Sequence, residues 1–159
     1  MLGELEESEG RFVVADLEAG VGTISRLRGS DVDRLIVVVE PYAKSIETAR
    51  RALKVAREVG IESVVLVANR STGEEDIAVI AQAFPEEQVF SIPEDPVVID
   101  ADRTGTAPID AEPASPAVAA IEGIAADLIR SSERGGRVAA ARPRSSGRLV
   151  TLQARPLPD

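Results

Sequence analysis

The chain has 159 residues and a mass of 16.8 kDa, which is enough for one domain with a hydrophobic core and short for two. Cysteine and histidine are both absent, which excludes disulfide scaffolds, Cys/His metal centres, thiol nucleophiles and a Ser-His-Asp triad. Aromatic residues make up only 3% and the net charge is −9, which argues against stacking on single-stranded nucleic acid and against polyanion binding by the whole domain.

The charge is unevenly distributed along the chain. Residues 1–131 hold 12 basic and 25 acidic residues, whereas residues 132–159 hold six arginines against two acidic residues. Because this last stretch is rich in Gly, Ser and Pro and has no apolar period, we predict an α/β domain over 1–131 and a disordered, Arg-rich tail over 132–159. The tail either serves solubility or is an electrostatic arm for an acidic partner, nucleic acid or its own acidic body.

No targeting or membrane-spanning segment is visible, so we expect a cytoplasmic protein.

Four short, continuously apolar segments predict strands that are buried on both faces of a parallel sheet. In chain order they are Phe12–Ala15, Arg34–Val39, Glu62–Ala68 and the weaker Gln88–Ile92. Helices are expected between and after them, at Ser45–Val59 with Ser45 as its cap, at Glu74–Phe84 and at Pro116–Ile129. This alternation predicts an α/β fold in which a mostly parallel sheet is flanked by helices.

Each predicted helix has an apolar stripe that should face the sheet. The expected inward positions are Ile46, Ala49, Leu53 and Ala56 in the first helix, Ile77, Ile80 and Ala81 in the second, and Val118, Ile121, Ile124, Ala125 and Leu128 in the third. Ligands of such folds lie beyond the carboxyl ends of the strands, so the segments that follow the strands form the candidate site.

Four segments at these strand ends carry residues suited to binding. Asp16-Leu-Glu-Ala-Gly20 offers a carboxylate for a Mg²⁺ shell or a water, and a glycine for close approach to a phosphate. Glu40-Pro-Tyr-Ala-Lys-Ser45 ends a strand and begins a helix. Asn69 offers the paired donor and acceptor that read a purine edge, and Pro93 leaves its strand where backbone could face a base. Each segment also has a plain structural interpretation, as an acidic turn, a helix cap or a turn.

The sequence resembles the carboxyl-terminal portion of the MinD/ParA/CooC-type P-loop ATPases of the SIMIBI class, closest to the CooC-like group. The resemblance rests on four motifs in this order: VVADLEAG, LIVVVEPYAKSIETA, VVLVANR and VFSIPEDPVV. The resemblance covers roughly residues 11–130. It implies ATP and Mg²⁺ as cofactors and dimerisation with ATP at the interface. It also implies a nucleotide-dependent switch that acts on metalloenzymes, membranes or DNA, with metalloenzyme maturation as the role of the CooC-like group.

The resemblance assigns roles to three residues after the first strand. Asp16 corresponds to the switch II aspartate near Mg²⁺ and the attacking water. Glu18 is the acidic residue that CooC-like proteins carry inside this motif, and we include it among the cofactor-binding residues. Gly20 corresponds to the position where the γ-phosphate is sensed.

The base site is assigned in the same way. By resemblance, Asn69 contacts adenine and the segment at Pro93 lines the base pocket. Many relatives have Asn-Lys where this chain has Asn69-Arg70. The asparagine is therefore kept, while any contact made by the side chain that follows it changes. We include Arg70 with Asn69 and Pro93 among the predicted cofactor-binding residues.

One part of the family pattern has no counterpart in the sequence. No segment matches GxxxxGK[ST], and the glycine-rich stretch Gly20-Val-Gly22-Thr23 has no lysine and the wrong length. Without the loop amides and lysine, we expect weak ATP binding and almost no hydrolysis by the chain alone. In the family fold the phosphate-loop strand lies between the Asp16 strand and Arg34–Val39. We therefore expect these two strands either to pair directly or to leave the first one loosely held.

Three explanations of the missing loop stay open: half of a split ATPase, a truncated longer protein, or a decayed relative. The split version predicts a separate chain that bears the phosphate loop. The other possible partners are a second copy and a client protein. The alternative function is a non-catalytic protein-interaction module that keeps the fold. A receiver-like domain could use Asp16 and Glu18 as its acidic cluster, but the lysine that it needs is missing from the required place.

Overall fold

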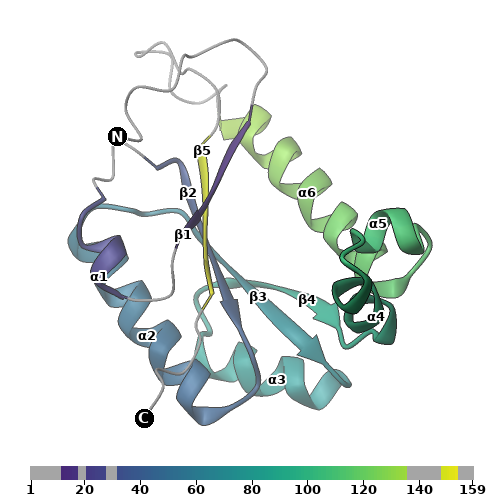
Figure 1. Cartoon of the computed structure of the whole chain (residues 1–159). Coiled ribbons are helices and arrows are strands. Elements are labelled where there is room, and N and C mark those ends of the chain that lie inside the picture. Colours follow the sequence, from purple (N-terminus) through teal and green to yellow (C-terminus); the bar gives the residue numbers. More distant parts are fainter. Residues whose placement is uncertain (1–11, 18–20, 28–31, 136–147, 154–159) are drawn as a thin grey trace.

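The computed structural model describes residues 12–17, 21–27, 32–135 and 148–153. Five parallel strands form one sheet in the order β1-β5-β2-β3-β4 (Figure 1). The strands are β1 (Val13–Leu17), β2 (Arg34–Val39), β3 (Val64–Ser71), β4 (Gln88–Pro93) and β5 (Arg148–Gln153). The helices are α1 (Val21–Ile24), α2 (Ala43–Glu58), α3 (Glu74–Ala83), α4 (Pro96–Thr104), α5 (Pro108–Ala111) and α6 (Pro116–Gly135). The prediction of an α/β fold with a parallel sheet between helices is confirmed.

β2 and β3 are buried on both faces, as their unbroken hydrophobic runs predict. The same prediction is wrong for β1, where Val14 is exposed, and β4 has no fully buried residue, because these two strands lie at the edges of the sheet. Along β2, Leu35 and Val37 pack with α1, α2 and α3, whereas Ile36 packs with α6 on the other face. Figure 1 shows α6 on the side of the sheet opposite α2. All four inward positions predicted for α2 are buried, and so are Val118, Ile124 and Leu128 of α6 and Ile80 of α3, while Ile77 is half-buried.

Three predicted inward residues are exposed instead. Ile121 and Ala125 lie on the outer side of α6, and Ala81 lies on the outer side of α3. The apolar stripes of these helices are wider than the strip of sheet that each helix covers, so periodicity overestimates the buried face. No helix within the described residues is long and apolar enough to cross a membrane.

The carboxyl-terminal stretch differs from the prediction of a disordered tail over 132–159. α6 continues to Gly135, and Arg148–Gln153 forms β5. β5 pairs in parallel with β1 on one side and with β2 on the other, with Val150 opposite both Ala15 and Leu35. Both expectations for the neighbouring strands are therefore wrong, because β1 neither pairs with β2 nor lacks a partner. The prediction rested on the Arg-, Gly- and Pro-rich composition of the whole segment. That average does not reveal the six-residue run RLVTLQ, which contains apolar and β-branched residues.

Three short helices, α1, α4 and α5, were not predicted. α4 has recognisable ends, since Asp95 caps it, Pro96 is its first residue and Gly105 ends it with a φ of 68°. The helix has only nine residues, which is too few for a clear apolar period.

A proline within β5 tests its place in the sheet. Val150→Pro removes a backbone N–H from a strand that has neighbours on both sides, and it leaves the facing carbonyl unpaired. We expect the free energy of unfolding to fall by about 1–3 kcal/mol, seen as a drop of several degrees in Tm by circular dichroism. Val150→Ile keeps the N–H and the β-branched shape and serves as the control. Equal Tm values for Val150→Pro and the native chain would contradict the insertion of β5.

Candidate functional site at the carboxyl edge of the sheet

The carboxyl ends of β2, β3 and β4 meet at one edge of the sheet. Val39, the last residue of β2, pairs with Ala68 of β3, and Asn69 pairs with Ile92 of β4. Glu40 follows directly after β2, so it lies beside Asn69 on the neighbouring strand. The structure therefore brings together Asn69, Arg70 and Pro93, as the sequence predicts, at the edge where ligands of parallel sheets bind.

A bulge interrupts the pairing of β3 at this edge. Asn69 is opposite Ile92 and Ser71 is opposite the next residue, Pro93, so Arg70 is an extra residue without a partner on β4. Arg70 has a φ of 56°, in the left-handed region that most side chains avoid. Bulges are rare in parallel pairs, and they re-aim side chains beside functional sites. The bulge therefore sets the direction of both Asn69 and Arg70.

The guanidinium of Arg70 joins the ends of three strands. Its Nη2 donates a hydrogen bond to Oε1 of Glu94 at 3.1 Å, and its Nη1 lies 3.6 Å from Oε1 of Glu40. The hydrogen bond to Glu94, followed by the charge of Glu40, raises the pKa of Arg70 above its ordinary value. The backbone N–H of Glu94 also donates to the carbonyl of Ser71 at 3.0 Å. Because all three side chains are partly exposed, we regard this Glu40–Arg70–Glu94 brace as a geometric constraint more than a source of stability.

The side chain of Asn69 is half-buried at this edge, and its amide forms no hydrogen bond within the described part of the chain. An amide offers one acceptor and two donors in a fixed plane. Asn69 is therefore positioned by the strand and the bulge, while its hydrogen-bonding groups are available to a ligand.

Ser45 does not have the role that the sequence predicts. α2 begins at Ala43 with Tyr42 in the N-cap position, so Ser45 lies inside the first turn. Its buried Oγ accepts a hydrogen bond from the backbone N–H of Glu40 at 3.0 Å. The helix starts two residues earlier than predicted, and this contact ties its first turn to the residue that follows β2. Ser45 thereby holds Glu40, one end of the brace.

Asp95 anchors the segment that follows Pro93. Its carboxylate accepts from the backbone N–H of Val97 at 2.9 Å, at the start of α4, and from that of Ala117 at 3.1 Å, at the start of α6. Ser115 completes the cap of α6 by accepting from the N–H of Val118 at 3.3 Å. The N–H of Ala117, then that of Val97, lowers the pKa of Asp95. One buried carboxylate therefore fixes two helix ends beside Pro93.

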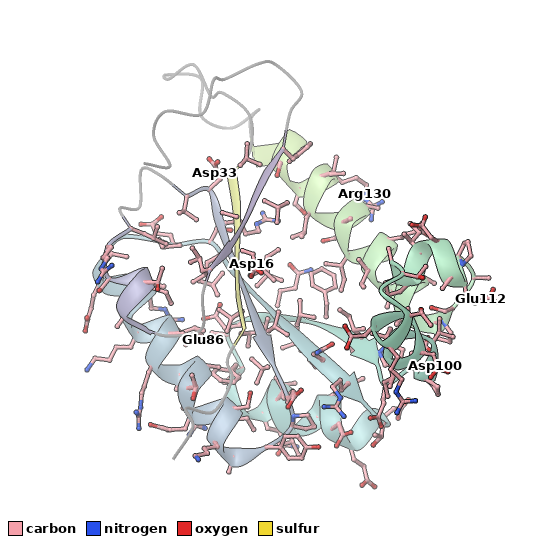
Figure 2. All side chains as sticks on the ribbon, viewed as in Figure 1. Asp16, Asp33, Glu86, Asp100, Glu112 and Arg130 are labelled. Carbon is pink, nitrogen blue, oxygen red and sulfur yellow. The ribbon has the colours of Figure 1, made fainter. Side chains whose placement is uncertain are left out.

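Asp16 lies away from Asn69. Through the sheet, Asp16 is opposite Thr151, Thr151 is opposite Ile36, and Ile36 is opposite Val65. Asn69 is thus four residues, about 13 Å, further along the strand direction, and three strand spacings, about 14 Å, to the side. Asp16, labelled in Figure 2, lies on β1 at one edge of the sheet. Glu18 and Gly20 lie outside the described residues.

The carboxylate of Asp16 is exposed and has no hydrogen bond or ion pair within the described part of the chain. No group of three His, Cys, Asp or Glu residues that could hold a metal ion occurs among the residues described. Mg²⁺ commonly binds one or two carboxylates together with substrate phosphates and waters. Asp16 fits such a shared shell as a single ligand and does not form an all-protein metal site.

A hollow of about 480 Å³ lies at the opposite edge, between the second half of α2 and the end of α3. Its lining includes Phe84, and the guanidinium of Arg50 lies over that ring, 6.0 Å from its centroid. Arg57, also in the lining, forms an ion pair with Glu87. None of the predicted site residues lines this hollow, so we do not assign the candidate site to it.

The sequence interpretation placed Glu40 in a candidate segment but gave no role to its carboxylate, nor to those of Glu94 and Asp95. A usable signal was present, because an acidic residue follows β2 and β4 directly and a basic one lies near the end of β3 between them. Once the strand order is known, opposite charges at the ends of adjacent parallel strands predict an ion pair.

No model of a known protein family matches the chain. Among curated proteins, the carbon monoxide dehydrogenase accessory protein CooC of Rhodospirillum rubrum is 32% identical over 103 residues, which are 64% of this chain and 39% of CooC. The uncharacterized ATP-binding protein MJ0547 of Methanocaldococcus jannaschii is 32% identical over 121 residues, 74% of this chain and 46% of that protein. A second ATP-binding protein of that organism, MJ0823, is 35% identical over 63 residues, 40% of this chain and 24% of its own length.

The chain therefore spans less than half the length of these curated relatives. The matches confirm the resemblance to the CooC-like group that the four motifs predict. The partial coverage agrees with a likeness to one portion of a longer protein.

Two substitutions separate the backbone strain at Arg70 from its ion pairs. Arg70→Ala and Arg70→Gly both remove the brace, but only glycine adopts a φ of 56° without steric cost. We expect the glycine variant to melt about 2–4 °C above the alanine variant, measured by scanning calorimetry. A Tm of the alanine variant equal to or above that of the glycine variant would contradict the left-handed backbone conformation at Arg70.

Asp95 should make stability depend on pH. Because the folded-state pKa of Asp95 is lowered, its contribution is complete above the unfolded pKa, about 3.9, and is lost as the pH falls through the lower folded pKa. Asp95→Asn leaves one acceptor oxygen for two N–H groups, so we expect a lower Tm at pH 7 and a difference from the native chain that shrinks below about pH 4. Asp110→Asn, on exposed α5, is the matched control. A pH-independent difference would show that the charge of Asp95 has no role.

Proposed function

We propose that the chain is an ATP-binding protein of the CooC type and that the carboxyl edge of β2, β3 and β4 recognises the adenine base. The proposal joins the similarity to CooC and to two ATP-binding proteins with the local geometry of this edge. The observation that carries it is the side chain of Asn69, held by a strand and a bulge with its amide unpaired within the described residues. An amide in this setting matches the adjacent donor and acceptor of adenine.

Pro93 and Arg70 have supporting roles in this proposal. Pro93 has no N–H, so the end of β4 offers the base a carbonyl and an apolar ring. Arg70 holds Glu40 and Glu94 through ion pairs, which keeps the two carboxylates from facing the nucleotide as free charges. This assigns to Arg70 a positioning role in place of a direct contact with ATP.

We propose that Asp16 contributes one carboxylate to a Mg²⁺ shell whose other ligands are phosphate oxygens and waters. Bound Mg²⁺ would neutralise phosphate charge there. Glu18 and Gly20 belong to the same proposed phosphate region. The chain contains no GxxxxGK[ST] motif, and the resulting loss of loop amides and lysine predicts weak phosphate binding and little hydrolysis by this chain alone. A separate chain that bears a phosphate loop would complete the site of a nucleotide-dependent switch or metalloenzyme-maturation ATPase, whereas a second copy of this chain would add a dimer interface but no phosphate loop.

The base site is tested by titrating the chain with ATP and Mg²⁺ in a calorimeter. We expect saturable binding that Asn69→Ala weakens about 5- to 150-fold, as the loss of a paired amide–base contact predicts. Gln82→Ala removes an exposed amide from α3 and should bind like the native chain. No binding up to the millimolar range, or equal binding by Asn69→Ala, would contradict the base site.

A non-catalytic interaction module is the second candidate. It is favoured by the separation of Asp16 from Asn69 in the sheet, which leaves the two proposed halves of the site apart. Exposed isoleucines on neighbouring helices, Ile99 of α4, Ile109 of α5 and Ile121 of α6, offer apolar contacts to a protein partner. The titration distinguishes the two candidates, because only the first predicts ATP binding that depends on Asn69.

A further inference from the structure

Tyr42 occupies a position that its side chain does not suit. It is the N-cap residue of α2, where Ser, Thr, Asp and Asn are favoured because their oxygens satisfy a free backbone N–H. The side chain of Tyr42 forms no cap hydrogen bond, and 62% of the residue is exposed. Folding therefore gains little from this tyrosine. A residue that breaks a local rule without a structural benefit is a candidate for function.

The backbone around Tyr42 is nevertheless well held. Its N–H donates to the carbonyl of Glu40 at 2.8 Å, and its carbonyl accepts from the N–H of Ile46 at 3.0 Å, in the first turn of α2. Glu40 forms an ion pair with Arg70. Arg70 directly follows Asn69. An exposed aromatic ring and a half-buried amide thus lie at one edge, on adjacent strand ends linked by the brace.

We propose that the ring of Tyr42 is a stacking surface for the purine base of the nucleotide whose edge Asn69 reads. This inference rests on the proposed function and adds a second recognition element to the same site. Hydrogen bonds fix a base within its plane, and an aromatic face fixes it perpendicular to that plane. The two contacts together define the orientation of a flat ligand.

The composition of the chain makes the proposal directly measurable. Tyr42 is the only tyrosine and there is no tryptophan, so the tyrosine emission of the protein comes from this single ring. A base stacked on Tyr42 should quench that emission. Titration with ATP and Mg²⁺ should therefore give a saturable loss of tyrosine fluorescence, with free tyrosine used to correct for absorption by the nucleotide.

Calorimetry on the full 159-residue chain separates the contribution of the ring from other effects. We expect Tyr42→Ala to weaken binding of ATP about 5- to 150-fold and Tyr42→Phe to stay near the native affinity, because phenylalanine keeps the aromatic face. Phe12→Ala, which removes a partly exposed ring next to the amino end of β1, should have no effect on affinity. Tripolyphosphate with Mg²⁺ lacks a base, so its binding should be the same for the native chain and for Tyr42→Ala.

The outcomes distinguish this inference from the proposed function. ATP binding that depends on Asn69 but is equal in Tyr42→Ala and the native chain overturns the stacking role and leaves the function standing. Equal weakening of ATP and tripolyphosphate also overturns it, because the ring would then act on phosphates or on the fold. Absence of ATP binding by the native chain, with an unchanged tyrosine signal, overturns both.

Discussion

The pairing of β5 between β1 and β2 is the constraint on which the arrangement of the sheet depends. β1 has β5 as its neighbour in the sheet, so the place of Asp16 is set by a strand from the other end of the chain. Parallel ladders transmit register residue by residue, from Asp16 through Thr151 and Ile36 to Val65. A different strand in this position, or the same strand in another register, would move Asp16 along the sheet relative to Asn69.

The other half of the candidate site does not depend on β5. Asn69 is held by β3, by the bulge at Arg70 and by ion pairs from Arg70 to Glu40 and Glu94. These contacts join β2, β3 and β4, of which β3 pairs with each of the other two, and the three strands pack against α2, α3 and α6. The proposed base site is therefore built by one part of the sheet, and the proposed phosphate region is attached to it through β5. This division agrees with a chain that corresponds to one portion of longer relatives.

Local sequence patterns predicted the elements well where a segment is covered on both faces. They did so poorly where burial depends on which other segment packs against it. The limits of β2 agree exactly with its apolar run, and the stripe of α2 is buried as expected. The outward position of Ala125 and the place of Ser45 inside its helix could not be read from spacing. The position of Ala125 depends on how wide the opposing surface is, which a repeat of apolar residues does not report. The place of Ser45 depends on its hydrogen bond with the N–H of Glu40, at the end of β2.

The sequence by itself determined the α/β class, the two-sided burial of β2 and β3 and the residues that follow the carboxyl ends of the strands, because hydrophobic period and turn chemistry are local properties. Its motifs also determined the resemblance to CooC-like proteins, to which similarity extends over 103 residues. Only the tertiary structure decided that RLVTLQ is a strand between β1 and β2 and that Arg70 joins three strand ends. It also decided that Asp16 lies apart from Asn69, both along the strand direction and across the sheet. These features arise from pairing between segments distant in the chain, and strand order and register are not encoded in any single segment.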